Sequence, residues 1–432
     1  MNTVLITAYA VNPYKGSEDG MGWNFILQAA RFQKVVAVTR ENNGPHIRRY
    51  LAENPEAAAL AANVDFRYFD LPAWTRWWKK GPLLSLIYFY MWQVGLAVWL
   101  RRQKLAVDLV HNLNFHNDWT PSFLWLLGRP LVWGPIGHHP PIPASHLAQY
   151  GPAAFVKDRM IGSLKHVFWA LDPFLRVTRR ASGRVLCMNS AVAPRLGLPA
   201  SRYEIVPSVA VDLPAASELV MKPTVEAHFT VMIAARMVPL KGFDMVILAF
   251  AKFYHALSAA ERPLARLLLI GSGPEESRLQ QLLKDNHLTD CTVHRPWLDR
   301  HELLDIYREA SVFFFPSHEG AGMVVTEAMS YGVPVLCYKN EGPGELTPAA
   351  SSLKVPYKSF KHNVKDFAER LRWLHDSPRL LAAEAALSRR HVAQHHTWER
   401  RGQQLQRIYQ QAIRNEQLAM SSEQLVVAGI GG

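Results

Sequence analysis

Two glutamates, Glu319 and Glu327, are the side chains in this sequence best suited to bind a sugar. They lie in the run FFFPSHEGAGMVVTEAMSYGVPV, where a β-rich stretch ends at Pro316, a glycine loop follows and a helical stretch opens. A carboxylate accepts hydrogen bonds from vicinal hydroxyls, and the free N–H groups at a helix start attract phosphate oxygens. The run therefore predicts a nucleotide or sugar site, although each glutamate taken alone also fits a solvated position. The predicted ligand-contacting residues here are Glu319, Gly320, Gly322, Met323, Val324 and Glu327.

A pair of cations follows another β-rich run. Arg236 and Lys241 come directly after VMIAA, and Gly242 then lets the chain reverse. Two cations at the carboxyl end of a strand suit a diphosphate, whereas an isolated pair is also common on a protein surface. Trp297 and Leu298 follow a later strand, where a base can stack or bind backbone atoms. The alternative for Trp297 is a place in the core.

Glycine-rich turns occur at two further strand ends. Gly16, Gly20 and Gly22 are predicted to form a loop that feeds a helix, a geometry that accepts anions, with an ordinary turn as the alternative. The run LLIGSGP lacks the full spacing of a dinucleotide fingerprint, so we expect its glycines to serve packing. His138 and His139 follow WGPIG and are predicted to lie on a loop that contacts an acceptor, unless this is an ordinary polar loop.

Short apolar runs alternate with helical stretches along the chain, which predicts an α/β fold with parallel sheets. Residues 207–223 are rich in proline, alanine and serine and indicate a linker between two doubly wound domains. Ligands of such sheets bind at the carboxyl ends of the strands, where the motifs above lie. The expected strands are 4–8, 35–39, 65–69, 109–112, 131–133, 183–188, 203–206, 230–234, 266–270, 292–294, 312–316 and 335–337. The expected helices are 22–32, 88–103, 242–255, 275–285, 300–310, 323–331 and 398–413.

The order of five motifs resembles that of the retaining glycosyltransferases of family 4, which have the GT-B fold. The motifs are YKGSEDGMGWN, WGPIG, ARMVPLKGFD, LLLIGSGPEESRL and HEGAGMVVTEAMSYGVPV, and the resemblance covers essentially the whole length. It implies two Rossmann-like domains that face each other across a cleft. The implied parts are an acceptor domain (1–206), a linker (207–223), a nucleotide-sugar donor domain (224–395), a helix returning to the first domain (396–415) and a flexible tail (416–432).

The resemblance also implies roles for the charged residues. Glu327 would bind the ribose of a nucleoside-diphosphate sugar, and Glu319 would contact the donor sugar near its anomeric centre. Arg236 and Lys241 would hold the diphosphate, and Gly20–Gly22 would close on the phosphates from the other domain. The family retains the anomeric configuration and transfers the sugar without a metal, and the leaving diphosphate takes the acceptor's proton. Arg236, Lys241 and the helix start at Gly322–Met323 would stabilise the charge on that diphosphate, and the sequence shows no clustered Asp pair or His/Asp set that demands an ion. We therefore expect no cofactor and no metal site.

The family places its catalytic histidine after the fourth strand of the first domain, and this chain offers two candidates there. His111 matches by its place at the strand end, which favours it slightly, and His116 matches by the Pro-Ser that follows it. Either also fits a buried structural position. The chain departs from the family at Ala321, where an aromatic residue is frequent, which affects the donor pocket.

The implied activity is sugar transfer to a glycan or lipid-linked acceptor, in surface polysaccharide or glycolipid biosynthesis. A sugar-nucleotide epimerase of similar two-domain fold is the alternative enzyme, and a scaffold without nucleotide affinity is the alternative outside catalysis. Transfer of the sugar to an acceptor with release of free nucleotide distinguishes the first from both others.

The chain is basic, with 48 Lys and Arg against 36 Asp and Glu and a net charge of +12, which calls for a negative partner. Scattered cations without a nucleic-acid-binding motif argue against DNA or RNA. Residues 81–100 carry no charge, are flanked by cations, and are long enough to span a bilayer. A core helix, a helix lying on an anionic membrane and a spanning helix are the three interpretations. Without a secretory signal or a disulfide framework, we expect a cytoplasmic protein, and the second of these interpretations would place it on the inner face of the plasma membrane.

Overall fold

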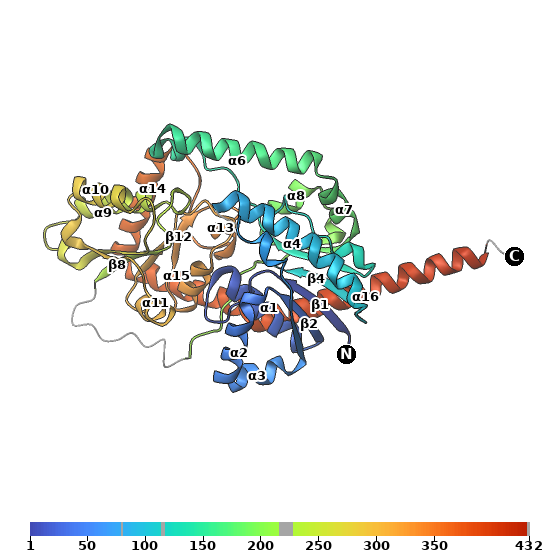
Figure 1. The fold of residues 1–432 in the computed structure, drawn as a ribbon. Helices are drawn as coiled ribbons and strands as arrows, with labels where there is room; N and C mark the ends of the chain where they lie inside the picture. Colours follow the sequence, from blue (N-terminus) through green and yellow to red (C-terminus); the bar gives the residue numbers. More distant parts are fainter. Residues whose placement is uncertain (79–80, 114–116, 216–227, 430–432) are drawn as a thin grey trace. The chain divides into compact units, whose positions relative to one another are not determined.

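The computed structural model describes residues 1–78, 81–113, 117–215 and 228–429, apart from the side chains of 82–83, 300–301 and 419–429 (Figure 1). The chain divides into two compact units. Unit 1 comprises Met1–His138, Leu164–Ser208 and Trp398–Gly432, and unit 2 comprises His139–Ser163 and Val209–Thr397. Residues 139–163 therefore pack with the C-terminal half of the chain, a correction to the expected domain of 1–206.

Unit 1 contains a seven-stranded parallel sheet with the strand order β3-β2-β1-β4-β5-β6-β7. The central strands are almost fully buried because helices cover a parallel sheet, so they appear in the sequence as continuous apolar runs. Ile6 of β1 lies opposite both Ala37 of β2 and His111 of β4. The strands are β1 Thr3–Ala8, β2 Lys34–Thr39, β3 Val64–Tyr68, β4 Leu109–Leu113, β5 Leu131–Ile136, β6 Ser182–Cys187 and β7 Tyr203–Ile205.

The helices of unit 1 differ from expectation at several ends, and α4 begins at Gly81 and not at residue 88. Helix α1 begins at Ser17, so Gly20 and Gly22 lie in its first turns and not in a loop. Helix α16 continues to Gly429, well beyond the expected end at residue 413, and packs beside α1 in unit 1. The helices are α1 Ser17–Ala30, α2 Gly44–Glu53, α3 Pro55–Leu60, α4 Gly81–Gln103, α7 Pro173–Ala181, α8 Val192–Leu196 and α16 Trp398–Gly429; α6 Gly151–Leu171 belongs partly to each unit.

Helix α4 contains residues 81–100, for which the sequence allowed three interpretations. Its Tyr88, Trp92 and Leu96 are buried in a cluster with Tyr9 of unit 1. No described helix has both the length and the apolar character needed to cross a bilayer. This finding removes the spanning interpretation of residues 81–100 and leaves the other two.

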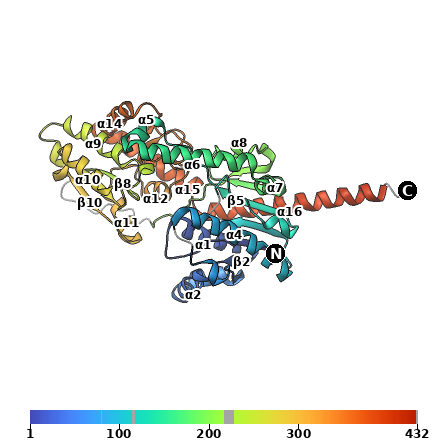
Figure 2. The same cartoon turned by 45° about the horizontal axis from the view of Figure 1, so that its top comes forward.

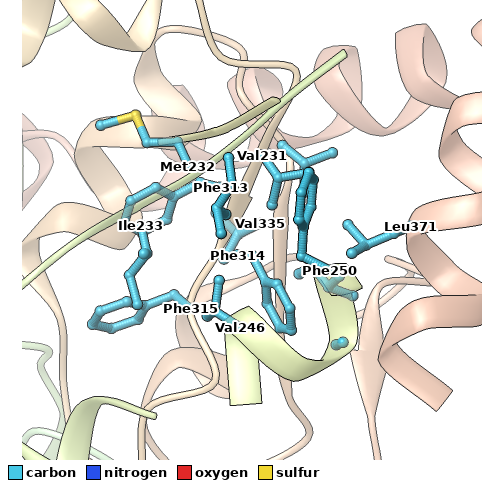
Figure 3. Packing of buried hydrophobic residues seen from close by; sticks show 14 of the residues in the cluster. Val231, Met232, Ile233, Val246, Phe250, Phe313, Phe314, Phe315, Val335 and Leu371 are labelled. Carbon is cyan, nitrogen blue, oxygen red and sulfur yellow. The ribbon is translucent and has the colours of Figure 1, made fainter. Parts of the chain in front are cut away.

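Unit 2 repeats the same topology with six parallel strands in the order β10-β9-β8-β11-β12-β13. The run Phe313, Phe314, Phe315 fills the core on both faces of the sheet, with Phe314 beside Val246 and Phe250 of α9 (Figure 3). The strands are β8 Phe229–Ala234, β9 Ala265–Ile270, β10 Thr292–Arg295, β11 Val312–Phe314, β12 Val335–Tyr338 and β13 Lys354–Val355, the last of which the sequence did not predict.

The helices of unit 2 surround this sheet. Helices α9 and α14 lie side by side, as both views of the ribbon show (Figures 1 and 2). Ser359 caps α14 by accepting a hydrogen bond from His362 N. The helices are α5 Ala144–Leu147, α9 Phe243–His255, α10 Glu276–Asp285, α11 Arg300–Tyr307, α12 Met323–Ser330, α13 Pro343–Leu346, α14 Phe360–Asp376 and α15 Pro378–His395.

Candidate active site

Lys241 and Glu319 meet at the carboxyl end of the unit 2 sheet. Lys241 follows β8 and Glu319 follows β11, and these two strands are neighbours at the point where the strand order reverses. Lys241 Nζ donates to Glu319 Oε2 over 2.5 Å, and both side chains are largely buried, at 19% and 14% exposure. Ligands of open α/β sheets bind at this switch point.

The second oxygen of the Glu319 carboxylate, Oε1, indicates that this site binds a ligand. Glu319 Oε1 is buried and accepts no hydrogen bond from the described part of the chain. A buried carboxylate oxygen without a partner loses a hydrogen bond to water and gains none, which costs about 1–3 kcal/mol. A ligand hydroxyl that donates to Oε1 would remove this cost, so the geometry suits a polyhydroxylated ligand.

Two hydrogen bonds to the Leu240 carbonyl, one from a backbone N–H and one from a serine hydroxyl, join the loops that hold Lys241 and Glu319. His318 N donates to Leu240 O over 2.9 Å, and Ser317 Oγ donates to the same carbonyl over 3.2 Å. Gly242 has φ +70°, and a Cβ there would lie 2.6 Å from Pro316 O. The lysine and the glutamate are therefore positioned by main-chain contacts rather than by their side chains alone.

The glycine loop leads directly into α12. Gly322 precedes the helix, and a Cβ on it would approach Glu319 Oε1 to 3.3 Å, so the helix start and the carboxylate lie close together. Met323 and Val324 form the first turn of α12, and Glu327 follows in a buried position. A helix start supplies N–H groups and a partial positive charge to an anion. The structure thus brings together the predicted residues of this run.

A second turn supports Glu319 from behind. A Cβ on Gly342 would lie 1.7 Å from Glu319 O, so only glycine fits there. Asn340 holds this turn, since its Oδ1 accepts from Gly344 N over 3.0 Å and its Nδ2 donates to Ser317 O over 2.9 Å. The sequence did not point to Asn340 and Gly342 as residues of the site. The signal that could have found them is the pair of glycines in the run NEGPGE, since glycine loops marked the other predicted ligand sites.

The Arg236 loop is shaped by the Gly-Ser-Gly-Pro turn. Arg236 is exposed and lies on the loop after β8. A Cβ on Gly271 or Gly273 would lie 1.8 Å from Ala235 O or 2.4 Å from Met237 O. Both glycines have positive φ and allow close contact with the loop, so the predicted packing role is confirmed.

His139 is in contact with the glutamate loop. Its Nδ1 accepts a hydrogen bond from Gly320 N over 3.0 Å, and both residues belong to unit 2. Tyr150, a few residues on, donates to Asp244 Oδ1 over 2.6 Å. These contacts explain why 139–163 belongs to unit 2. They place His139 against the predicted donor residues, and its predicted contact with an acceptor stays a prediction.

A buried aromatic cluster lies beneath the loop. His318 Nδ1 is 2.8 Å from Tyr357 Oη, and its ring stacks on Tyr338 at a centroid distance of 5.3 Å. His146 packs edge-on against His318, and its Nε2 is 3.2 Å from Asn363 Oδ1. Burial lowers the pKa of His318 to about 3, with His146 as a second cause, so His318 is neutral. The cluster is a rigid support that no sequence motif signalled.

His111 is a buried structural histidine, which corrects the slight preference for it as the catalytic residue. Its Nε2 lies 2.7 Å from Gly134 O and therefore donates, so Nδ1 accepts from Tyr409 Oη at 2.6 Å. Burial lowers the pKa of His111 to about 4. With both ring nitrogens bonded inside unit 1, His111 cannot take a proton from a substrate. The other candidate, His116, lies outside the described residues.

The remaining predicted residues of unit 1 are buried. His138 Nδ1 lies 2.7 Å from Asp118 Oδ2, and both side chains are almost inaccessible. Gly20 is buried in α1, where a Cβ would lie 2.4 Å from Lys15 O. Gly22 is buried two residues later. Gly20 therefore serves close packing of the preceding loop onto the helix, and the flexible-loop prediction for 16–22 is wrong.

Trp297 is 76% exposed, so its alternative place in the core is wrong. It follows β10, and Leu298 beside it is half-buried against the core of unit 2. An exposed indole at a strand end remains suited to stacking.

Three sequence similarities to known proteins agree with this geometry. Residues 222–390 match the family "Glycosyl transferases group 1". A GDP-mannose-dependent monoacylated alpha-(1-6)-phosphatidylinositol monomannoside mannosyltransferase of Corynebacterium glutamicum is 34% identical over 187 residues, 41% of this chain and 45% of that protein. A D-inositol 3-phosphate glycosyltransferase of Saccharomonospora viridis is 26% identical over 92% of this chain and 91% of its own length.

Solved structures show the same fold at low identity. HepE of Anabaena, solved with UDP and glucose, superposes with a TM-score of 0.59 at 15% identity, covering 94% of this chain and 98% of that one. A sucrose-phosphate synthase of Thermosynechococcus elongatus superposes with a TM-score of 0.63 at 16% identity, covering 96% and 100%. The two-unit α/β fold expected from the sequence is confirmed. The match of residues 222–390 to the group 1 glycosyl transferases agrees with the resemblance that the motifs indicated.

Proposed function

We propose that this protein transfers a sugar from a nucleoside-diphosphate sugar to a hydroxyl of a glycan or lipid-linked acceptor, with retention of the anomeric configuration. The observation that carries the proposal is the Lys241–Glu319 pair at the switch point of unit 2, with the buried Oε1 of Glu319 left for a ligand. The match of residues 222–390 to the family of group 1 glycosyl transferases supports the reaction class.

The donor occupies the carboxyl end of the unit 2 sheet in this proposal. Glu319 Oε1 accepts from a sugar hydroxyl, and Glu327 on α12 binds the ribose. Lys241 and Arg236 hold the diphosphate, with the first N–H groups of α12 as further donors. Trp297 and Leu298 contact the base. The name of one relative mentions GDP-mannose, and a structural neighbour was solved with UDP, so both bases are candidates.

The transfer step balances without a second protein nucleophile. The bond between the anomeric carbon and the diphosphate oxygen breaks, and the acceptor oxygen bonds to the same face of that carbon. The acceptor's proton passes to the departing diphosphate oxygen. Negative charge grows on the diphosphate as the bond breaks, so Lys241, Arg236 and the start of α12 stabilise the transition state more than the ground state.

We propose further that the reaction needs no metal. In the described residues, the carboxylates and histidine close enough to share an ion are Glu261, His375 and Asp376. Arg372 already pairs with Glu261 at 3.4 Å and with Asp376 at 2.7 Å, and none of these residues belongs to the Lys241 or Glu319 loops. Transfer should therefore proceed at the same rate in the presence of a chelator, and loss of activity there would contradict this part of the proposal.

The acceptor class rests on the relatives. Two of them are named for transfer to inositol phosphate or to a phosphatidylinositol mannoside. A phosphorylated or lipid-linked polyol in surface glycan or glycolipid synthesis, on the inner face of the plasma membrane, is the corresponding proposal here.

The first experiment is a thermal-shift screen of the full chain against UDP and GDP sugars, because a ligand that binds the native state raises its unfolding temperature. Lys241→Ala and Glu327→Gln should abolish the shift and the turnover. Lys252→Ala is the matched control, since Lys252 is an exposed cation on α9 of the same unit. A wild-type rate in both site variants would refute the proposal.

The assay must also separate transfer from epimerisation. Transfer yields free nucleoside diphosphate together with a glycosylated acceptor, whereas an epimerase returns a sugar nucleotide of changed configuration. A product spectrum with interconverted sugar nucleotides and no glycosylated acceptor would favour the epimerase.

A further inference from the structure

A hollow of about 500 Å³ opens at the amino-terminal edge of the unit 1 sheet. Its walls come from the start of β1, the end of α4, the chain before β4 and the loop before β5, all within unit 1. Because parallel strands point the same way, this edge is opposite the carboxyl ends at which ligands of such sheets bind. The hollow therefore has no part in the proposed catalytic site. Its apolar lining residues are Leu5, Leu100, Leu105, Val107, Leu126 and Leu127.

Three cations surround these apolar walls. Arg101 and Lys104 come from the end of α4, and Arg129 comes from the loop before β5. Each is exposed, and none forms an ion pair with a carboxylate in the part of the chain that the structure describes. No acidic residue lines the hollow, and the nearby Asp108 accepts from Thr3 N over 2.7 Å. The positive charge of this hollow is therefore available to an anionic ligand.

Helix α4 carries an exposed apolar stripe, and the C-terminal end of this helix lines the hollow. Its members are 37–44% exposed and recur every three or four residues, which places them on one face of the helix. The same spacing continues to Arg101 and Arg102 at the helix end. Trp74 and Trp77, just before α4, are 73% and 76% exposed. The stripe consists of Leu84, Ile87, Met91, Val94 and Val98.

The hollow, its three cations and the α4 stripe together indicate the chemical class of the ligand. An apolar stripe that ends in cations, with exposed tryptophans, is the composition of a surface that lies in the interface of an anionic bilayer. A hollow with leucine walls and three cations would suit the phosphate and glycerol of a lipid whose chains remain in the membrane. A small soluble anion would use the cations alone and would leave the stripe without a partner.

We propose that this hollow, formed by Arg101, Lys104 and Arg129 over its leucine walls, binds the phosphate headgroup of an anionic membrane lipid while the α4 stripe lies in the bilayer surface. The site is distinct from the donor site and independent of the proposed function. It holds the enzyme on an anionic membrane whatever its acceptor is.

The test is co-sedimentation of the full chain with vesicles of phosphatidylcholine, with or without phosphatidylglycerol, at low and high salt. Binding should require phosphatidylglycerol and weaken with salt, since exposed charges are screened. Arg101→Glu combined with Arg129→Glu should lower the partition coefficient by at least about fivefold for each cation removed. Arg379→Glu combined with Arg390→Glu makes the same change of net charge on exposed positions of unit 2 and should bind as the wild type does.

A second variant tests the stripe. Met91→Asn combined with Val94→Asn should weaken vesicle binding at any salt concentration, because it removes exposed apolar surface. The control is Val156→Asn combined with Met160→Asn, at exposed apolar positions on α6. Circular dichroism should show folded protein for all variants. If the stripe variant does not fold, the test rests on Arg101→Glu combined with Arg129→Glu, since both of these side chains are exposed.

Three outcomes would overturn the proposal. Equal binding to vesicles with and without phosphatidylglycerol would exclude a headgroup site. Equal loss in the arginine pair and in its charge-matched control would show that only net charge matters. Displacement from vesicles by inorganic phosphate at an equal phosphate concentration would identify a site for a soluble anion, not for a lipid.

Discussion

A single methyl group at Gly342 should disable the proposed donor site while leaving the fold in place. The φ of Gly342 is −105°, outside the left-handed region, and the obstacle to a side chain there is steric contact with the backbone of Glu319. A Cβ there would lie 1.7 Å from Glu319 O and 2.8 Å from Glu319 C, whereas real Cβ atoms essentially never approach within 3.0 Å. In Gly342→Ala the two loops must separate by more than 1 Å at this point.

The consequence for turnover follows from what the displaced residue does. Glu319 holds Lys241 through a 2.5 Å contact, so a shift of its backbone changes the position of the carboxylate and of the cation together. A misplacement of about 1 Å at a catalytic group costs roughly 100-fold in rate. Overpacking of this kind also costs about 1–3 kcal/mol of stability, which lowers the unfolding temperature but leaves the protein folded at assay temperature.

The assay is the initial rate of nucleoside-diphosphate release in the presence of acceptor, together with donor affinity by calorimetry. Gly162→Ala is the control, because a Cβ on this helical glycine meets nothing within 4 Å and alanine favours a helix. It should leave the rate unchanged. A wild-type rate in Gly342→Ala would refute the argument that the turn at 340–344 positions Glu319.

Three further predictions concern buried polar contacts. The pKa of His111 is lowered to about 4, so the unfolded chain takes up its proton below pH 6.5 before the native state does. The stability that His111 contributes is thus complete above pH 6.5 and is lost as the pH falls toward 4; at pH 5 denaturant unfolding should show about 2 kcal/mol less than at pH 7, and His111→Gln should reduce that slope. Tyr150→Phe removes the donor to the buried Asp244 carboxylate and should cost about 1.5–3 kcal/mol, with a double-mutant cycle against Asp244→Asn showing strong coupling. His139→Ala removes the acceptor of Gly320 N–H and should weaken donor binding by about fivefold in calorimetry, whereas an unchanged affinity would show that this contact only supports the fold.

The strands could be predicted from the sequence because parallel strands buried on both faces are continuous apolar runs. The run FTVMIA of β8 and the run ARLLLI of β9 are examples, and both were located to within one residue. Strand β13 was missed because Lys354–Val355 is too short to show any pattern. Helix α6 has no buried residue, so its apolar residues gave no stripe that pointed to a core.

The donor-side residues could be predicted for a related reason. The carboxyl ends of neighbouring parallel strands meet at one edge, so residue type and place after a strand suffice to bring Lys241 and Glu319 together. His111 shows the limit of this reasoning. Its place at a strand end suggested catalysis, but the partner that occupies its Nδ1 is Tyr409, 298 residues away in the sequence. Likewise, no local pattern indicates that 139–150 packs with unit 2, since this depends on Gly320 and Asp244.

The contacts of Lys241 and Glu319 indicate which of the two units determines nucleotide affinity. Within the described residues, the contacts that position this pair come from unit 2: the Leu240 carbonyl, the 340–344 turn, His139 and the aromatic cluster around His318. A site assembled within one unit needs no ordering by the other before a nucleotide binds, so its affinity should depend on unit 2 alone. Substitutions such as Asp118→Ala, which removes the buried hydrogen-bond partner of His138 in unit 1, should therefore leave nucleoside-diphosphate affinity unchanged. If such a change lowers turnover at constant nucleotide affinity, unit 1 contributes to the chemical step or to the acceptor; if affinity falls with it, the donor site extends beyond unit 2.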